Sequence, residues 1–202
     1  MTSEPGEHPE PHADLADRSP LLYSLDEGTV LSRLHDKNFG PIYFGVKSSY
    51  RFDSPDGSFG VLYVGLDEHC AFIETFGQST GIRLVSQKAL AQRYLSYLTL
   101  RQPLHLIDLA NTGGLARIGA DSRLFSGSHA IAQRWSAALH AHPAKPAGIF
   151  YPARHDTARF ACGLYDLPVS AFSVNTVGSL IDPPNRKLLA NILNTYDFGL
   201  IP

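Results

Sequence analysis

Residues 50–76 (YRFDSPDGSFGVLYVGLDEHCAFIETF) constrain the fold more than any other part of the chain, because three structural signals follow one another within them. Residues 54–58 (SPDGS) combine Pro with Asp-Gly, which is typical of a turn. The apolar residues 59–64 (FGVLYV) indicate a buried strand. Residues 67–76 (DEHCAFIETF) have acidic side chains in the first turn and fit a helix. The sequence therefore predicts a turn, a strand and a helix in direct succession.

The remaining segments mix strand and helix patterns. Short apolar runs predict strands at residues 29–35, 41–45, 104–109, 148–151 and 161–165, with a last strand within residues 196–201. Helical spacing of apolar residues predicts a helix over residues 129–140, and a helix that begins with Pro is expected over residues 183–194. Residues 86–97 fit either a helix or a strand. Because strands and helices do not alternate regularly, a single α+β domain is favoured over a doubly wound sheet.

Composition narrows the classes of protein that fit. The chain has 202 residues, enough for one domain with a sizeable core. Its net charge of −2 and its pI near 6.5 lack the basic surplus of a nucleic-acid-binding protein, so no direct nucleic-acid contact is expected. No apolar run is long enough for a transmembrane helix, and the N-terminus lacks the features of a secretory signal. We therefore expect a cytoplasmic protein with no membrane contact.

Two further expectations concern the N-terminus and the cysteines. Residues 1–20 are rich in Pro, Glu, Asp and His and poor in apolar residues, which indicates a flexible tail. The folded domain is then expected over residues 21–202. Cys70 and Cys162 each lie in an apolar setting, so two buried free thiols are favoured over a disulfide.

Two arginines are candidates for binding a phosphate group. Arg51 lies at the edge of the predicted turn, where it either pairs with Asp53 or Asp56 on the surface or clamps a phosphate with its planar guanidinium. Arg33 lies inside the apolar pattern VLSRL, where a buried arginine needs a partner or a ligand. The residues alone leave both alternatives open.

Glu74 and Tyr63 are the other candidates. Glu74 lies among apolar residues of the predicted helix, and charged glutamate is rarely buried unless it is paired or functional. It either pairs with Arg51 or Arg33, or holds a ribose hydroxyl and stabilises an oxocarbenium-like transition state. Tyr63 points away from Leu62 in the predicted strand and is either a core residue or a stacking surface for a ligand.

Other patterns that carry chemistry are missing or weak. The chain contains no Walker A motif, no dinucleotide-binding glycine fingerprint and no Gly-x-Ser-x-Gly elbow. His129, His140, His142 and His155 do not form a metal-binding pattern, so no metal is expected.

Several motifs together resemble the RES domain, a family named for an arginine, a glutamate and a serine. They are VLSRLH around Arg33, YRFDSPDG around Arg51, VLYVG around Tyr63 and AFIETF around Glu74. Further matches are LHLIDLANTGGLARIGAD, the Gln-Arg-Trp of the long predicted helix, GIFYPARHD and NILNTYDFGL. The resemblance covers residues 22–201, and RFDSPDG followed by LYVG and AFIET is its most specific part.

This resemblance implies a fold and an activity. RES proteins are typically toxins of toxin–antitoxin pairs, with a fold like that of ADP-ribosyltransferases, in which helices flank a split β-sheet around an NAD cleft. Members degrade NAD as a substrate, some with inorganic phosphate as acceptor, and others transfer ADP-ribose to a protein. Cleavage of the nicotinamide–ribose bond, with phosphate or water as acceptor, is the expected reaction, and mono-ADP-ribosylation of a cellular protein is the alternative. The expected partner is an antitoxin of helix-turn-helix type.

The resemblance also implies roles for residues of this sequence. Arg51 and Glu74 are the expected catalytic residues, with Glu74 acting on the ribose next to nicotinamide. Four residues are expected to bind NAD, and they are Arg33, His35, Tyr63 and Arg154. His35 takes a place that is often basic in the family.

One position departs from the family pattern. The family has a serine in a Tyr-x-Ser-Arg sequence, but this chain has Ala153 between Pro152 and Arg154. Ser126 and Ser128 belong to another segment and are not expected to replace it. Losing one hydrogen bond to a charged group costs about 1.5–3 kcal/mol. A third hypothesis is therefore a weakly active or inactive protein that binds NAD or an antitoxin.

Overall fold

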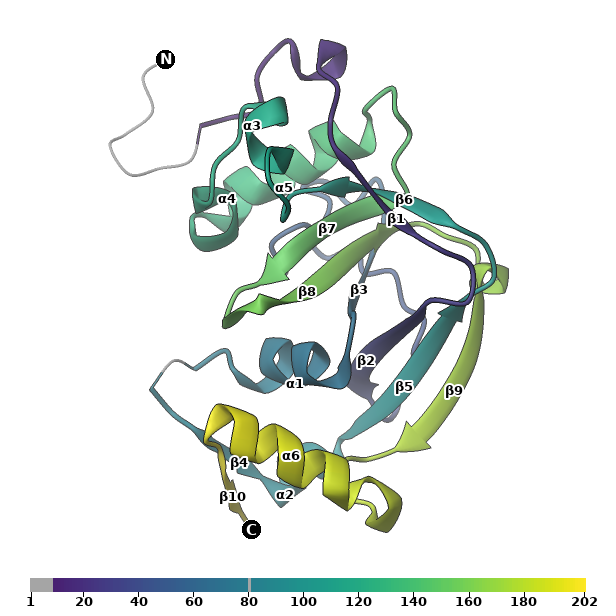
Figure 1. Cartoon of the computed structure of the whole chain (residues 1–202), viewed down its shortest axis with the longest axis vertical. Coiled ribbons are helices and arrows are strands. Elements are labelled where there is room, and N and C mark those ends of the chain that lie inside the picture. The colour runs from purple at the N-terminus through teal and green to yellow at the C-terminus, as the bar shows by residue number, and fades with distance from the viewer. Residues whose placement is uncertain (1–8, 80) are drawn as a thin grey trace.

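An eight-stranded sheet organises the computed structural model, which describes residues 9–79 and 81–202 (Figure 1). Its strand order is β1-β6-β7-β8-β3-β2-β5-β9, and all neighbours are antiparallel except β6 and β7. A second sheet pairs β10 with β4 in parallel. The strands are β1 (Leu22–Leu25), β2 (Val30–Asp36), β3 (Val61–Gly65), β4 (Leu84–Ser86), β5 (Arg93–Leu100), β6 (Leu104–Asp108), β7 (Gly148–Ala153), β8 (Asp156–Tyr165), β9 (Phe172–Gly178) and β10 (Gly199–Ile201).

The large sheet is split between β2 and β3. These neighbours share one register pair, Ser32 with Gly65, whereas β2 pairs with β5 along its whole length. Beyond that pair, β2 no longer lies beside β3. The segment that connects the two strands lies there instead, and its Gly45 forms an isolated bridge with Val61. The structure thus confirms the predicted α+β class and the split sheet flanked by helices.

Strand β3 separates two apolar clusters. Because side chains alternate along a strand, Leu62 and Val64 pack into one cluster while Val61 and Tyr63 face the other. The cluster on the Leu62 side is built mainly from strand residues, and the cluster on the Tyr63 side includes Trp135. Tyr63 therefore lies on the face of the sheet that is covered by helices.

Helix α1 (Glu68–Phe76) follows β3 directly, as predicted. Asp67 caps its N-terminus, since Oδ1 accepts a hydrogen bond from the N–H of Cys70 at 2.8 Å. Residues 70–73 are buried, which leaves Glu74 half-buried at the border of the packed face. Cys70 and Cys162 of β8 are buried free thiols, which confirms that prediction.

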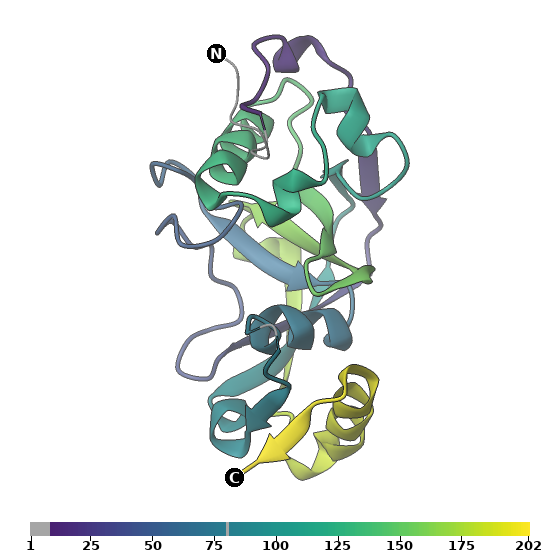
Figure 2. The same cartoon turned by 90° about the vertical axis from the view of Figure 1, so that its left-hand side faces the viewer.

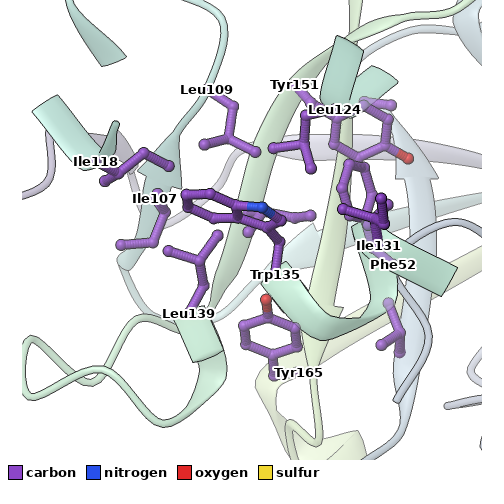
Figure 3. Close-up of a cluster of buried hydrophobic side chains, with 14 of the residues drawn as sticks. Phe52, Ile107, Leu109, Ile118, Leu124, Ile131, Trp135, Leu139, Tyr151 and Tyr165 are labelled. Atoms are coloured by element: carbon purple, nitrogen blue, oxygen red, sulfur yellow. The ribbon is translucent and has the colours of Figure 1, made fainter. Parts of the chain in front are cut away.

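Helix α5 (His129–His140) has the predicted bounds and carries the largest fully buried side chain, Trp135. Figure 3 shows Trp135 within its apolar cluster, with Ile107 and Leu109 on one side and Phe52 and Tyr151 on another. Phe52 precedes β3 and Tyr151 belongs to β7, so one core packs both segments against α5.

The remaining helices lie toward the two ends of the molecule, as Figures 1 and 2 show. Helices α3 and α4 lie near α5 at one end, and α2 and α6 lie near the small sheet at the other. Within the described part of the chain, no helix is long and apolar enough to cross a membrane. The bounds are α2 (Gln87–Ala91), α3 (Gly114–Ile118), α4 (Arg123–Ser126) and α6 (Arg186–Tyr196), with 3-10 turns η1 (Leu15–Asp17), η2 (Val169–Ala171) and η3 (Pro183–Asn185).

Some strand predictions need correction. Residues 41–45 do not form a strand, because β2 and β3 diverge there and only Gly45 pairs. Strand β8 begins well before residue 161, so most of the polar run RHDTAR is strand. The edge strands β1 and β9 were not predicted, because they are short or mostly exposed and lack a clear apolar pattern.

The N-terminal segment packs on α5 over residues 9–20 and is not a tail there. Leu15 is buried in the cluster of Trp135, and Trp135 Nε1 donates a hydrogen bond to the carbonyl oxygen of Pro9 at 2.8 Å. The polar composition of this segment gave no sign of the packing, because a few contacts with the buried indole of Trp135 are enough to hold the segment in place. Residues 1–8, the rest of the predicted tail, lie outside the described residues.

Candidate active site

Glu74 of α1 meets the turn between β7 and β8. Its Oε1 accepts a hydrogen bond from the backbone N–H of Arg154 at 2.9 Å. Burial raises the pKa of Glu74 above its ordinary value, while this hydrogen bond and the charges of Arg154 and Arg51 oppose the increase. Among residues 9–79 and 81–202, no group donates a hydrogen bond to Oε2. The carboxylate is therefore partly desolvated and has one oxygen available for a ligand.

Arg51 lies in the loop before β3 and reaches the C-terminal end of α4. Its Nη1 donates to the carbonyl oxygens of Gly127 at 2.8 Å and Leu124 at 3.4 Å. In the described part of the chain it forms no ion pair with Asp53 or Asp56. The alternative of a surface ion pair is therefore wrong, and the remaining guanidinium donors are available for another group.

Tyr63 and the loop before it are joined through one buried carboxylate. Asp53 is 1% exposed, and its Oδ1 accepts a hydrogen bond from Tyr63 Oη at 2.9 Å. Its Oδ2 accepts from the N–H groups of Ser49 and Tyr50, both at 2.9 Å. The ring of Tyr50 lies edge-on to that of Tyr63, with centroids 5.7 Å apart. Tyr63 is thus a structural link, and it also lies near enough to Arg51 to affect the pKa of that residue.

Helix α5 holds the same loop from the other side. Gln133 Nε2 donates to the carbonyl oxygens of Ser48 and Tyr50, both at 2.9 Å. Ser136 Oγ donates to the carbonyl oxygen of Phe52 at 2.6 Å. The Gln-Arg-Trp motif therefore contains a loop anchor, a role that the sequence alone did not assign to Gln133.

Asp53→Asn is expected to lower the free energy of unfolding by about 1–3 kcal/mol. The amide keeps only one acceptor oxygen, so at least one of the donors from Ser49, Tyr50 and Tyr63 loses its acceptor. Urea denaturation followed by tryptophan fluorescence measures the change. Asp26→Asn in an exposed turn is the control, with an expected change within about 0.5 kcal/mol. Equal unfolding midpoints for the two variants would contradict this role of Asp53.

Arg33 approaches the site from β2, on the other side of the split. Its Nη1 lies 3.4 Å from the carbonyl oxygen of Tyr43, the one hydrogen bond of its side chain within the described residues. Burial lowers the pKa of Arg33 to about 10, with Tyr50 raising it and Arg93 lowering it. Tyr50 thus lies near both Arg33 and Tyr63, which places Arg33 at the border of the same region.

His35 is built into the sheet. It is 6% exposed, and Nδ1 lies 2.9 Å from the carbonyl oxygen of Phe39 while Nε2 lies 2.9 Å from Ser96 Oγ. Burial lowers the pKa of His35 below its ordinary value. Both ring nitrogens are engaged by the protein, so the structure does not bring His35 to the Glu74 carboxylate.

Two site residues were missed as candidates. Tyr151 is 7% exposed, and burial raises its pKa well above the ordinary value, with Glu74 adding to the increase. Partial burial lowers the pKa of His129, and the charges of Arg51 and Arg154 lower it further. The GIFYPARHD motif already contained Tyr151, whereas His129 was considered only as a metal ligand. No metal-binding group of three or more His, Cys, Asp or Glu occurs within the residues described.

Positive charge exceeds negative charge around Glu74. Burial lowers the pKa of Arg51, and the nearby charge of Arg154 lowers it further. The guanidinium of Arg154 makes no ion pair or hydrogen bond in the described part of the chain, since only its backbone N–H is used. Two close guanidinium groups with one partly desolvated carboxylate favour an anionic ligand.

A surface hollow of about 250 Å³ lies beside Arg154. It lies between α4 and the β7–β8 hairpin, so the same helix end that Arg51 contacts forms one of its walls. The residues lining it are Ser122, Phe125, Ser126, Pro152, Ala153, Arg154 and Thr157.

A comparison with known families places the whole of this region in one domain family. The model of the RES domain matches residues 30–182, which is more than half of the chain. The chain belongs to the RES domain family. The match includes every predicted site residue, namely Arg33, His35, Arg51, Tyr63, Glu74 and Arg154.

One relative and one solved structure are similar to this RES domain. A protein of Sinorhizobium fredii named "Probable toxin y4kH" is 33% identical over 103 residues, which cover 50% of this chain and 78% of the relative. The toxin–antitoxin complex MbcT–MbcA of M. tuberculosis contains a chain that matches with a TM-score of 0.58 and 14% identity. That match covers 83% of this RES domain and 92% of the other chain, and it shows a shared fold.

Proposed function

We propose that this RES domain is the toxin of a toxin–antitoxin pair and that it consumes NAD by cleaving the bond between nicotinamide and ribose. The observation that carries the proposal is the Glu74 carboxylate, partly desolvated, with a raised pKa and with Arg51 and Arg154 beside it. Perturbed carboxylates next to arginines are typical of functional sites. The family membership and the similarity to a probable toxin support it.

The arginines would bind the pyrophosphate of NAD. Arg51 and Arg154 lie on the Glu74 side of the split sheet, and Arg33 lies across it. Planar guanidinium groups suit phosphate oxygens, and binding of the remote phosphates positions the reacting ribose carbon. Tyr50 and Tyr63 would contact the nicotinamide end, since their rings meet at the split.

Glu74 would stabilise the charge that develops on the ribose. As the bond between the anomeric carbon and the nicotinamide nitrogen breaks, the electron pair leaves with nicotinamide and the sugar becomes oxocarbenium-like. A nearby carboxylate stabilises this cation and holds a ribose hydroxyl. An oxygen of phosphate or water then attacks the carbon and loses its proton to solvent when the acceptor carries one. Arg154, through its N–H bond to Oε1, would keep the carboxylate in place.

The acceptor and the partner complete the proposal. Inorganic phosphate or water would serve as acceptor, and no metal takes part. A protein side chain as acceptor would make the chain a mono-ADP-ribosyltransferase with the same site. The partner would be an antitoxin of helix-turn-helix type that covers the site in the cytoplasm, consistent with a structural relative that was solved as a toxin–antitoxin complex.

The unmodified protein is expected to release nicotinamide from NAD. Chromatography of the reaction with and without phosphate identifies the acceptor, because phosphate gives ADP-ribose with a phosphate on the anomeric carbon and water gives ADP-ribose. Incubation of labelled NAD with a cell lysate tests for a protein acceptor. If no nicotinamide is released with phosphate, without phosphate or with the cell lysate, the proposal that the protein is an NAD-consuming enzyme is wrong. Tight NAD binding in that case would favour the weakly active or inactive protein that Ala153 suggested.

A further inference from the structure

The hollow beside Arg154 combines a cation with hydroxyl groups. Ser126 of α4 and Ser122, the residue before α4, line one side of it, and Thr157 of β8 lines the other. These three hydroxyls make no side-chain hydrogen bond within the described residues. The volume of about 250 Å³ is below the roughly 300–1,000 Å³ of pockets for whole drug-sized ligands. The hollow therefore has the size and the donors for one phosphoryl group together with its nearest atoms.

The walls of the hollow contact residues of the candidate active site. Arg51 Nη1 donates to the carbonyl oxygens of Leu124 and Gly127, which lie on either side of Ser126 in the chain. On the opposite wall, the N–H of Arg154 donates to Glu74. Among the three hydroxyls, that of Ser126 is therefore the one next to the helix end that Arg51 contacts.

Ala153 provides no donor at this place. Its side chain is fully buried in the apolar cluster of Trp135, although the residue borders the hollow. A hydroxyl for a ligand must then come from another element. Ser126 belongs to a distant segment of the sequence, and the packing of α4 against the β7–β8 hairpin brings it to the same hollow.

We infer that this hollow is a phosphoryl subsite in which Ser126 supplies the hydroxyl donor that Ala153 lacks. The identity of the substrate rests on the proposed function, and the phosphoryl group is either the orthophosphate acceptor or the pyrophosphate of NAD. Arg154 supplies the charge, and the Ser126 hydroxyl donates to a phosphate oxygen. The contact of Arg51 with the end of α4 holds Ser126 on the side of the hollow opposite Arg154.

Calorimetric titrations with inorganic phosphate and with ADP-ribose, at constant ionic strength, test the subsite. Ser126→Ala is expected to weaken binding of one of these probes or both by about tenfold, because a hydrogen bond to a charged group is lost. Weaker binding of phosphate alone identifies the acceptor, and weaker binding of ADP-ribose identifies the pyrophosphate. The matched control is Ser128→Ala, an exposed serine outside the hollow, which leaves both affinities unchanged.

Unchanged affinity of Ser126→Ala for both probes would overturn the subsite, and so would the absence of binding by the unmodified protein. The outcome is independent of turnover, because neither probe contains nicotinamide. If the unmodified protein releases no nicotinamide but Ser126→Ala binds phosphate more weakly, the proposed reaction fails and the subsite stands. If turnover is normal and both affinities are unchanged, the reaction stands and the subsite fails.

Discussion

Glu74→Gln is expected to lower kcat/KM for nicotinamide release from NAD by about 10²–10³-fold, the usual cost of removing a group that stabilises transition-state charge. Glutamine keeps the size of the side chain and an acceptor for the N–H of Arg154, but it has no negative charge to stabilise the ribose cation. The loss should therefore appear mainly in kcat. In the unmodified protein, kcat/KM should fall as the pH decreases through the pKa of Glu74, which burial raises above its ordinary value.

The same substitution is expected to stabilise the fold at neutral pH. The folded-state pKa of Glu74 is raised, so this group favours the folded state below its ordinary pKa, and that contribution is lost as the pH rises through the raised value. Glutamine removes the cost of an ionised, desolvated carboxylate. Thermal unfolding should show a higher Tm for Glu74→Gln at neutral pH, and the difference should shrink in acid.

The control for both effects is Glu68→Gln in the first turn of the same helix. Glu68 Oε1 accepts a hydrogen bond from Tyr97 Oη at 2.8 Å, which an amide oxygen also accepts. This variant should keep kcat/KM close to that of the unmodified protein. If Glu74→Gln retained full activity, or lost activity only through unfolding, the role given to Glu74 would be wrong.

Arg51→Ala is expected to lower kcat/KM by about 10²-fold, mainly through KM. The change removes a charged donor for the pyrophosphate, worth about 1.5–3 kcal/mol, and also frees the end of α4 that Arg51 holds. Arg51→Lys should recover only part of the loss, because an ammonium group lacks the planar fork that meets carbonyl and phosphate oxygens together. Steady-state kinetics with varied NAD separates the two parameters.

Arg101→Ala, an exposed arginine in the turn between β5 and β6, is the control for this prediction. It removes the same charge from the protein without touching the site, so kcat/KM should be unchanged. Identical losses for the Arg51 and Arg101 variants would indicate a general electrostatic effect and contradict a phosphate contact by Arg51.

Local patterns predicted much of the fold. The alternation of β3 placed Tyr63 opposite Leu62, and apolar spacing gave α5 its bounds. Both depend on which face of one element is buried, and a short window of sequence contains that information. The strand expected at residues 41–45 failed because strand formation needs a neighbour, and β2 and β3 diverge there.

The candidate site divides in the same way. One continuous segment of the sequence contains Arg51, Tyr63 and Glu74, so their residue types could be identified from it. The residues that they contact could not be predicted from that segment. Arg51 was open to pairing with a nearby aspartate, and the structure instead joins it to carbonyl groups at the end of α4. His35 stays a predicted ligand-binding residue, and only the structure showed that its ring nitrogens are hydrogen-bonded to Phe39 and Ser96.

The sequence by itself determined β3, α1 and α5 and the chemical groups of this RES domain, including the arginines, the carboxylate and the absence of a serine at Ala153. These follow from local periodicity and from residue identity. Only the tertiary structure decided that β2 and β3 part, that Asp53 joins Tyr63 to its loop, and that Ser126 reaches the hollow beside Arg154. Each of these depends on packing between segments far apart in the chain, because a buried polar group takes whichever partner the shared core brings within hydrogen-bonding distance.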